Sequence, residues 1–442
     1  MQRANCTRKS LRRGVSPLSP APRRAGNRLT DGTIHSKMMG VKGNTPITKE
    51  RTVSMSFHLD PAIMPVGCFD GGIDLFESQY AVPNGVSYNS YVVLDEKIAV
   101  LDTVDPRKTA QWLDNLERAL EGRAPDYLVI HHVEPDHAGS VSALAEKFPQ
   151  MTLVGNAKTF PMLAAFTGQT FEGRTLVVKE GDRLELGRHA LTFYLAPMVH
   201  WPEVMVSYEE TGRTLFSADG FGRFGSANPG EPWVDEARRY FINIVGKYGT
   251  NVQALLKKAA ALDIQAVCPL HGPVLSGEAL ALALEKYDLW SRYVPEERGV
   301  LVAYASIHGN TAKAALELAD MLRAQGLTVE AMDLARRDWA EAVAGAFRFS
   351  GLVLAAASYD AGVFPPMAQL LARLKSKGFR DRTVGLMENG TWGPTALRAM
   401  LAELEGMKGL NILEPKITIR SAATGADREK MGELAQAMAA AI

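Results

Sequence analysis

One short segment of the sequence carries several side chains that can ligate a metal. An apolar run, Leu128 to Ile130, leads into His131-His-Val-Glu-Pro-Asp-His-Ala-Gly139. Four candidate ligands follow the end of this expected strand: His132, Glu134, Asp136 and His137. Because Pro135 would break the interior of a helix, we expect these residues to lie on a loop, where their side chains can converge.

Three further candidate ligands follow other expected strands. They are His200 in Pro197-Met-Val-His-Trp-Pro202, Asp219 in Phe216-Ser-Ala-Asp219 and His271 in Cys268-Pro-Leu-His-Gly-Pro273. A single metal ion takes about four ligands, so seven groups favour two ions with one carboxylate shared between them. Four imidazoles and three carboxylates without a thiolate suit iron, manganese or zinc, and the share of carboxylates favours iron.

Isolated histidines have a simpler interpretation, which is a hydrogen-bonded residue in the core or on the surface. His200 or His271 alone would be read in that way, and only the cluster changes the interpretation. His131 points to the opposite face of the strand end from His132, so we expect it to pack or to support a ligand. His35, His58 and His189 have no supporting pattern.

A second group of candidate binding residues begins after the expected strand Leu301–Ala305. The turn Ser306-Ile-His-Gly-Asn-Thr311 leads from this strand into a helix. Such a turn directs backbone N–H groups and a helix N-terminus at a common point, where a phosphate can bind. The alternative is that Asn310 or Thr311 only caps the helix.

Two later loops of similar composition favour the binding interpretation. Ser358-Tyr-Asp-Ala-Gly362 and Glu388-Asn-Gly-Thr-Trp-Gly393 each follow an apolar strand. In an open α/β sheet, ligands bind outside the carboxyl ends of the strands, and one aromatic residue in each loop could flank a flat ring. A phosphate joined to a flat ring predicts flavin mononucleotide (FMN). The predicted contacts are Ser306, Ile307, His308, Gly309, Asn310, Thr311, Ser358, Tyr359, Asp360, Gly362, Asn389, Gly390, Thr391, Trp392 and Gly393.

The elements that position these residues differ between the two halves of the chain. In the first half, strand-like runs often follow one another directly, which predicts an α+β sandwich layered as helix, sheet, sheet, helix. These runs are 87–93, 97–102, 127–131, 151–154, 191–195 and 204–208. We expect this domain to cover residues 56–295.

The second half alternates strands and helices and predicts a doubly wound parallel α/β domain over residues 299–442. The expected strands are 301–305, 328–332, 352–356 and 383–387, and the expected helices are 311–324, 366–374 and one from Asp427. The charged stretch Ser291 to Arg298, which contains Pro295, is the expected linker.

Composition supports a folded protein in a reducing compartment. Of the 442 residues, 46% are hydrophobic and 22% charged, which excludes collagen-like and wholly disordered chains. No apolar run approaches the roughly 20 residues that a membrane span needs. Cys6, Cys68 and Cys268 are too scattered for a disulfide framework. We therefore expect a cytoplasmic protein with neither a membrane nor a nucleic acid as its partner.

Charge is distributed unevenly along the chain. Residues 1–51 hold 12 Lys or Arg against Asp31 and Glu50, a net charge of +10, so the remainder carries −10. We expect residues 1–55 to be a disordered basic extension. It could be an upstream stretch, with translation starting at Met38, Met39 or Met55, an organelle transit peptide, or an arm that binds nucleic acid.

Taken together, these motifs resemble the flavodiiron proteins, or A-type flavoproteins. In that family a metallo-β-lactamase-like domain precedes a flavodoxin-like domain, and the resemblance covers about residues 60–440. It rests on His132-Val-Glu-Pro-Asp-His137, His200-Trp-Pro202, Leu215-Phe-Ser-Ala-Asp219, Pro269-Leu-His-Gly-Pro273 and the three glycine-containing loops. The chain departs from the family at Ala357-Ser358, where many members carry Pro-Thr.

The resemblance implies a role for each candidate ligand. His132, Glu134 and His200 would hold one iron, Asp136, His137 and His271 the other, and Asp219 would bridge them. Hydrolases of the same fold usually carry histidine at the position of Glu134 and bind zinc. A carboxylate there favours iron instead.

The family's activity and partners are implied in the same way. Members reduce dioxygen to water, nitric oxide to nitrous oxide, or both, with electrons passing through FMN to the diiron centre. The resemblance implies a head-to-tail homodimer, or a tetramer, and an external electron donor such as rubredoxin. Two alternatives remain: a zinc hydrolase of the metallo-β-lactamase type with an appended flavodoxin-like module, and a flavin electron carrier whose first domain is a degenerate scaffold.

Overall fold

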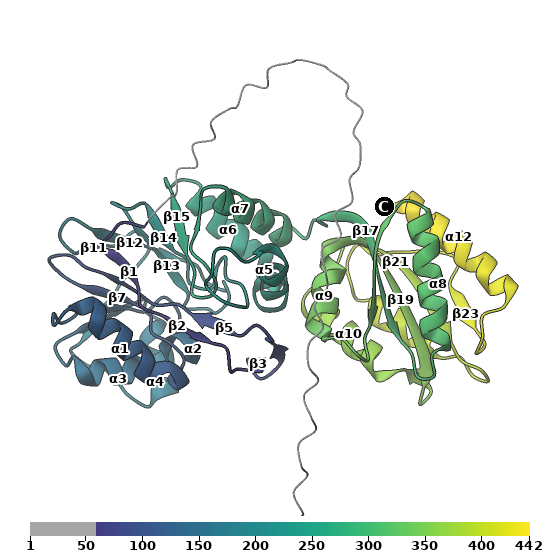
Figure 1. Cartoon of the computed structure of the whole chain (residues 1–442), viewed down its shortest axis with the longest axis horizontal. Coiled ribbons are helices and arrows are strands. Elements are labelled where there is room, and N and C mark those ends of the chain that lie inside the picture. Colours follow the sequence, from purple (N-terminus) through teal and green to yellow (C-terminus); the bar gives the residue numbers. More distant parts are fainter. Residues whose placement is uncertain (1–58) are drawn as a thin grey trace, which may run out of the picture. The chain divides into compact units, whose positions relative to one another are not determined.

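The first half of the folded chain contains two six-stranded sheets (Figure 1). The computed structural model describes residues 59–442, so the predicted basic extension lies outside the described residues. The first sheet has the order β1 (Ile63–Pro65), β6 (Tyr91–Val93), β7 (Ala99–Leu101), β8 (Tyr127–Val129), β9 (Thr152–Gly155) and β10 (Thr175–Val177). The second runs in chain order through β11 (Arg183–Glu185), β12 (Ala190–Leu195), β13 (Met205–Glu209), β14 (Thr214–Phe216), β15 (Ala266–Cys268) and β16 (Leu275–Ser276).

Apolar side chains fill the space between the two sheets. Val93, Val129 and Val154 of the first sheet share one buried cluster with Phe193 and Phe216 of the second. Alternate residues of each strand point to this interior, and the others point to the outer helices. The sheets are therefore held face to face by burial of apolar surface.

Helices cover the outer face of each sheet and complete the predicted four-layer sandwich. Figure 1 shows α1 (Thr109–Leu120), α3 (Val141–Lys147) and α4 (Thr159–Thr167) beside the first sheet, and α6 (Gly249–Ala259) and α7 (Gly277–Ser291) beside the second. In α1, Trp112 and Leu116 are fully buried and lie one turn apart, which is the spacing of a single packed face. Another helix, α5 (Val234–Tyr240), continues into one π-helical stretch, Phe241–Val245.

The prediction of one strand over 87–93 was wrong. Residues Val86–Tyr88 form β5, which pairs with β2 (Cys68–Asp70), whereas β6 belongs to the first sheet. Between them the Asn89 side chain donates to the carbonyls of Pro269 and Gly272, at 2.9 and 2.7 Å. This long-range contact draws the chain out of the ladder, and the local apolar pattern carries no sign of it. A short hairpin, β3 (Leu75–Phe76) and β4 (Tyr80–Ala81), also escaped prediction.

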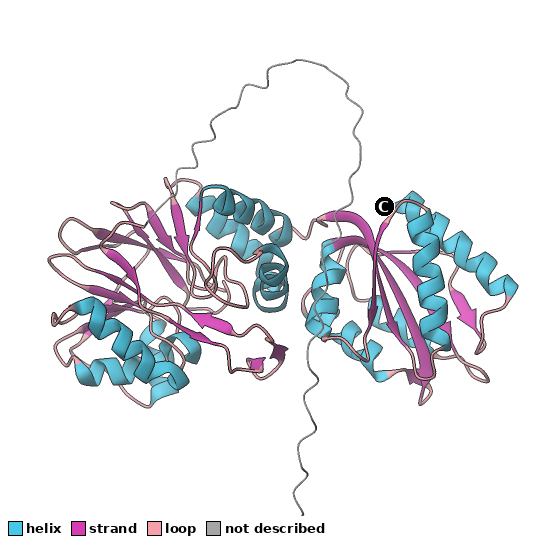
Figure 2. Ribbon diagram, in the orientation of Figure 1, coloured by secondary structure: helices cyan, strands magenta, loops and turns pink. Residues whose placement is uncertain are grey.

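The second half is the predicted parallel α/β fold, with a sheet ordered β18 (Thr328–Asp333), β17 (Glu297–Ala305), β19 (Phe349–Tyr359), β21 (Thr383–Asn389) and β22 (Asn411–Ile412). A further strand, β23 (Ile417–Ile419), pairs with β21, and β20 (Gly362–Val363) pairs with β19. Helices lie on both faces of this sheet (Figure 2). They are α8 (Asn310–Ala324) and α12 (Gly425–Ala441) on one face, and α9 (Trp339–Arg348), α10 (Pro365–Ser376) and α11 (Ala396–Leu404) on the other.

Two predictions for this half need correction. Strand β17 begins at Glu297, inside the expected linker, so the connection from α7 is shorter than predicted. Helices α9 and α11 were not predicted, although a parallel crossover from β18 to β19 requires an element such as α9. Most of α9 is buried, including Ala340, Val343 and Phe347, and its 10 residues are fewer than the roughly 11 to 18 over which a helical period is counted.

Among residues 59–442, no helix has both the length and the apolar character that crossing a bilayer requires.

Candidate metal centre

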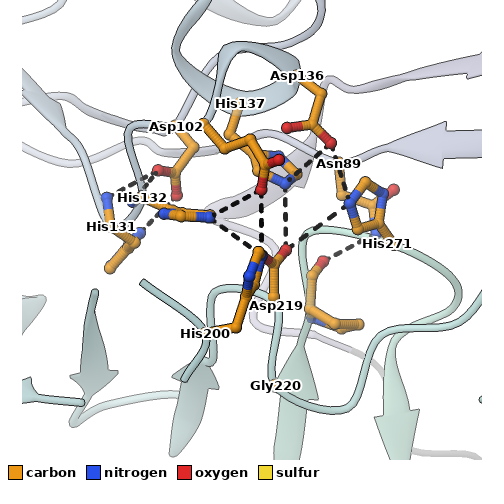
Figure 3. A network of polar contacts seen from close by, with 12 residues as sticks. Asn89, Asp102, His131, His132, Asp136, His137, His200, Asp219, Gly220 and His271 are labelled. Atoms are coloured by element: carbon orange, nitrogen blue, oxygen red, sulfur yellow. Dashed lines mark hydrogen bonds and ion pairs between the residues drawn. The ribbon is translucent and has the colours of Figure 1, made fainter. Parts of the chain in front are cut away.

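The seven candidate ligands lie in loops and turns that follow four strands of the two sheets. His132 and Glu134 follow β8, His200 lies between β12 and β13, Asp219 follows β14, and His271 follows β15. Their side chains converge (Figure 3). Two groups of potential metal ligands result: His132, Glu134, His200 and Asp219 in one, and Asp136, His137 and His271 in the other.

Asp136 and His137 do not lie on a loop, as predicted, but in a one-turn helix, α2 (Pro135–Ala138). Pro135 occupies the first turn of this helix, where its missing N–H has no intrahelical partner to lose and its fixed φ is already helical. Proline breaks a helix only in the interior, and Pro135 lies in the first turn, so the helix can form. The turn places Asp136 and His137 beside His271, the third member of the second group.

Asp219 connects the two groups because its two oxygens face different histidines. Its Oδ2 atom lies 3.0 Å from Nε2 of His200 and 3.3 Å from Nε2 of His132. Its Oδ1 atom lies 3.1 Å from Nε2 of His137 and 3.7 Å from Nε2 of His271. A carboxylate in this position can bridge two ions.

The other two carboxylates complete the groups. Glu134 Oε2 is 3.2 Å from Nε2 of His132 and 3.1 Å from Nε2 of His200. Asp136 Oδ2 is 3.4 Å from Nε2 of His137 and 3.3 Å from Nε2 of His271. Ligands that each lie about 2.1 Å from one first-row metal ion are about 3.0 to 3.4 Å from one another. The observed separations match that spacing except for the 3.7 Å between Asp219 Oδ1 and His271 Nε2, which is slightly longer.

Several atoms of this centre have no hydrogen-bond partner within residues 59–442, although all are buried. They are both carboxylate oxygens of Asp136 and of Asp219, both ring nitrogens of His137, and Nε2 of His271. Leaving so many polar atoms unpaired away from water would be costly. Metal ions would satisfy them, so the residues present fit a two-metal site.

Two of the carboxylates, Asp219 and Glu134, are held in the ionised form that ligates metals. Burial alone would raise the pKa of Asp219, but the imidazoles of His137 and His132 outweigh it and hold this pKa well below its ordinary value. Burial would likewise raise the pKa of Glu134, and contacts with His132 and His200 lower it.

Away from the metal-ligand groups, a cavity of about 450 Å³ lies at the carboxyl ends of β17, β19 and β21. All three predicted loops line it. The predicted residues that do so are Ile307, His308, Asn310, Thr311, Ser358, Tyr359, Asp360, Asn389, Gly390, Thr391, Trp392 and Gly393. Ser306, Gly309 and Gly362 do not line it.

The three residues outside this lining shape the loops instead. The Gly309 backbone has φ +94°, a conformation that favours glycine, and its N–H donates to Ser306 Oγ at 3.1 Å. The Gly362 carbonyl accepts a hydrogen bond from Thr395 Oγ1. Prediction missed Ala357, Ala361, Thr395 and Ser421, which also line the cavity. Ser421 follows β23, a strand that was not predicted.

Comparison with known proteins decides the family. Residues 86–272 match a family model described as ODP family beta lactamase. The rubredoxin-oxygen oxidoreductase of Megalodesulfovibrio gigas is 28% identical over 397 residues, which cover 87% of this chain and 96% of that relative. The anaerobic nitric oxide reductase flavorubredoxin of Aliivibrio salmonicida is 28% identical, over 78% of this chain and 71% of its own.

A solved structure extends the likeness across both halves. The rubredoxin oxygen:oxidoreductase structure from Desulfovibrio gigas superimposes with a TM-score of 0.81 and 26% identity, covering 86% of this chain and 96% of that one. The chain belongs to the flavodiiron protein family. Its metallo-β-lactamase-like and flavodoxin-like folds are those expected from the sequence motifs.

In this flavodiiron protein, hydrogen bonds fix the orientation of two of the histidines. His132 Nδ1 lies 2.6 Å from Glu203 Oε1, and His271 Nδ1 lies 2.7 Å from the carbonyl oxygen of Ser87. With Nδ1 engaged in this way, Nε2 of each ring faces the centre. The sequence pattern indicated neither Glu203 nor Ser87 as a partner of these histidines, although Glu203 lies only three residues after His200.

His131 lies outside both ligand groups, as predicted. Its Nδ1 is 2.5 Å from Asp102 Oδ2 and its Nε2 is 2.8 Å from Ser207 Oγ. Asp102 Oδ1 also accepts the backbone N–H of His131 at 2.7 Å. This buried network joins the end of β8 to β13 and holds the backbone from which His132 extends.

Several aromatic residues pack against the candidate ligands, among them Trp201 and Tyr240. Trp201 meets the His132 ring edge to face, with centroids 5.1 Å apart. Tyr240 is buried with its ring 5.5 Å from that of His271. Burial, and then the carboxylates of Asp219 and Asp136, raise the pKa of Tyr240 well above its ordinary value, so its phenol remains protonated.

Proposed function

We propose that the chain is an FMN- and diiron-dependent reductase of dioxygen, nitric oxide or both, forming water and nitrous oxide respectively. The observation that carries the proposal is Asp219, whose two oxygens face two separate groups of buried ligands. The named activities of relatives that align over most of this chain support it.

His132, Glu134 and His200 would hold one iron, and Asp136, His137 and His271 the other, with Asp219 shared. Bound iron would supply redox electrons and open positions for a diatomic gas. The protein's own contribution is to keep Asp219 and Glu134 ionised and to orient the imidazoles of His132 and His271. Glu134 favours iron over zinc, because a hard oxygen ligand replaces one imidazole.

The cavity at the carboxyl ends of β17, β19 and β21 would hold FMN, which would pass electrons one at a time. The turn Ser306–Thr311 and the N-terminus of α8 offer backbone N–H groups to the phosphate. Tyr359 and Trp392 are 45% and 93% exposed at the cavity and would flank the ring. The remaining predicted contacts in the Ser358 and Asn389 loops would hold its polar edges.

The hydroxyl of Ser358 supports this assignment despite the departure from Pro-Thr. It accepts hydrogen bonds from the backbone N–H groups of Thr395 and Ala396, at 2.8 and 3.1 Å. It therefore ties the second loop to the start of α11, a role that a threonine hydroxyl could also fill.

We further propose domains over 56–295 and 299–442, a head-to-tail homodimer or tetramer, and an external electron donor such as rubredoxin. A relative's name, rubredoxin-oxygen oxidoreductase, supports the donor. Cys68 and Cys268 are buried in separate strands, so they cannot form part of a four-thiolate iron site with each other.

The test begins with the composition of the purified protein. We expect about two irons and one FMN per chain. After anaerobic reduction, parallel stopped-flow mixing with dioxygen and with nitric oxide should reoxidise the flavin, and the ratio of the two rates gives the preferred gas. A colourless protein that holds zinc and hydrolyses thioesters or phosphodiesters without reductant would overturn the proposal, as would flavin with less than one metal per chain.

A further inference from the structure

Glu203 is a buried carboxylate beside only one of the two ligand groups. It is 1% exposed. Its Oε1 atom lies 2.6 Å from Nδ1 of His132 and accepts the backbone N–H of Val133 at 3.0 Å. Its Oε2 atom has no hydrogen-bond partner among the described residues. The charge of this carboxylate is therefore directed at the His132 ring.

The other ligand group has no equivalent partner. Nδ1 of His271 faces the neutral carbonyl oxygen of Ser87, and Nδ1 of His137 has no hydrogen-bond partner within residues 59–442. Among the described residues, His271 is therefore the histidine of that group whose Nδ1 atom has a hydrogen-bond partner, and this partner is an uncharged carbonyl oxygen.

The ligands themselves do not explain a difference between the two positions. Each group has two histidines and one carboxylate of its own, Glu134 or Asp136, and each receives one oxygen of Asp219. Their formal charges are equal. The surrounding carboxylates are unequal, because Glu203 lies on the side of His132, and so does Asp102, whose Oδ1 is 3.4 Å from the His132 backbone nitrogen.

A carboxylate that accepts the Nδ1 proton of a ligating imidazole makes the opposite nitrogen a stronger donor. In a buried site its negative charge also acts with little screening. Both effects bind a metal ion more tightly, and both favour the higher oxidation state of iron.

We propose that Glu203 is a positioning residue that makes the two metal positions unequal. The position of His132, Glu134 and His200 would hold an iron more tightly than that of Asp136, His137 and His271, and it would favour the ferric state more strongly. This inference rests on the proposed two-iron site.

The experiment follows iron release from the full-length protein to an excess of a coloured ferrous chelator under anaerobic, reducing conditions. We expect two phases of equal amplitude in the natural protein. Glu203→Gln keeps an oxygen that can accept from His132 Nδ1 but removes the charge. It should accelerate the slow phase about 10- to 100-fold and leave the fast phase unchanged. His271→Asn should remove the fast phase and thereby assign it.

A matched control comes from β13, the strand that follows Glu203. Glu209 is also buried, and its Oε1 lies 2.9 Å from Nδ1 of His189, which is not a candidate ligand. Glu209→Gln therefore makes the same chemical change in a buried carboxylate–histidine pair outside the ligand groups. It should leave both release phases unchanged, and thermal unfolding of both variants separates loss of stability from loss of metal.

A second readout concerns oxidation state. Redox titration followed by electron paramagnetic resonance should show that Glu203→Gln raises the reduction potential of one iron and changes the mixed-valent signal, whereas Glu209→Gln does neither. Single-phase release in the natural protein, or a slow phase that Glu203→Gln leaves unchanged, overturns the inference. A natural protein that binds fewer than two irons overturns the proposed function itself.

Discussion

Nε2 of His200 lies 3.0 Å from one oxygen of Asp219, and the other oxygen of the same carboxylate faces the second group of ligands. One side chain therefore joins two sites that would otherwise be independent. Its removal should affect both metal positions at once.

We predict that Asp219→Asn loses iron from both positions and lowers turnover with either gas at least tenfold, because an amide carries no charge to share between two ions. Iron per chain and reductase rate are the measurements. Asp263→Asn is the control, since Asp263 pairs with Arg213 at the surface and should keep both values. An Asp219→Asn protein with two irons would contradict the bridging role.

Glu134→His should change the metal preference of the first position. It creates the H-x-H-x-D-H pattern, in which imidazole replaces a hard oxygen ligand. We expect the zinc content to rise toward one ion per chain and gas reduction to fall at least tenfold, both measured after growth in medium with equal iron and zinc. Unchanged iron content would show that Glu134 does not select the metal.

Trp392→Ala should weaken FMN binding without destabilising the fold. The side chain is 93% exposed and lines the proposed flavin cavity, so its loss costs ring contacts but little packing. We expect the Kd to rise about tenfold, which corresponds to about 1.4 kcal/mol. Titration of the flavin-free protein by fluorescence measures this, with the melting temperature of that protein as the control. An unaltered Kd would place the ring elsewhere.

Ser358→Ala should lower stability by about 1 kcal/mol, because its hydroxyl accepts two N–H groups at the start of α11. The same change should weaken FMN binding, since the loop lines the cavity. Ser358→Thr keeps the hydroxyl and should behave like the natural protein. Chemical denaturation measures the free energy of unfolding of the two variants and of the natural protein. If Ser358→Ala is as stable as the natural protein, the Ser358 hydroxyl does not stabilise the start of α11.

The buried pair Arg238–Glu296 predicts a pH-dependent contribution to stability. Glu296 also accepts a hydrogen bond from Trp290 Nε1 at 2.7 Å. Burial alone would raise the pKa of Glu296, but the Arg238 guanidinium outweighs it and holds this pKa below its ordinary value. A lowered carboxylate pKa gives stability that is fully present above the unfolded pKa, about 4.3, and is lost as the pH falls through the folded value.

Glu296→Gln should therefore lower the free energy of unfolding by about 3 kcal/mol at pH 7, as expected when one partner of a buried pair is removed. Its deficit relative to the natural protein should shrink below about pH 4. Denaturant titrations at several pH values measure this difference. A deficit that stays constant to pH 3 would show that the charge of Glu296 is not responsible.

Much of the architecture could be predicted from local pattern. The alternation after residue 300 predicted a parallel sheet, and the strands from 127 and 191 were placed within about two residues because apolar runs bounded by turn residues are local signals. The helix α9 escaped because its 10 residues are fewer than the roughly 11 to 18 over which a helical period is counted. The break at Asn89 escaped because its partners, Pro269 and Gly272, lie about 180 residues away.

The candidate site, like the fold, could be predicted from the sequence only in part. Residue type and spacing alone picked out the seven candidate ligands, since histidines and carboxylates that follow strands are recognisable one segment at a time. Only the folded chain decided which of Asp219's oxygens faces which histidine, and that Glu203 lies against His132 while Ser87 lies against His271. These relationships depend on packing two sheets face to face, and a linear sequence contains no local record of a distance between segments that meet only in three dimensions.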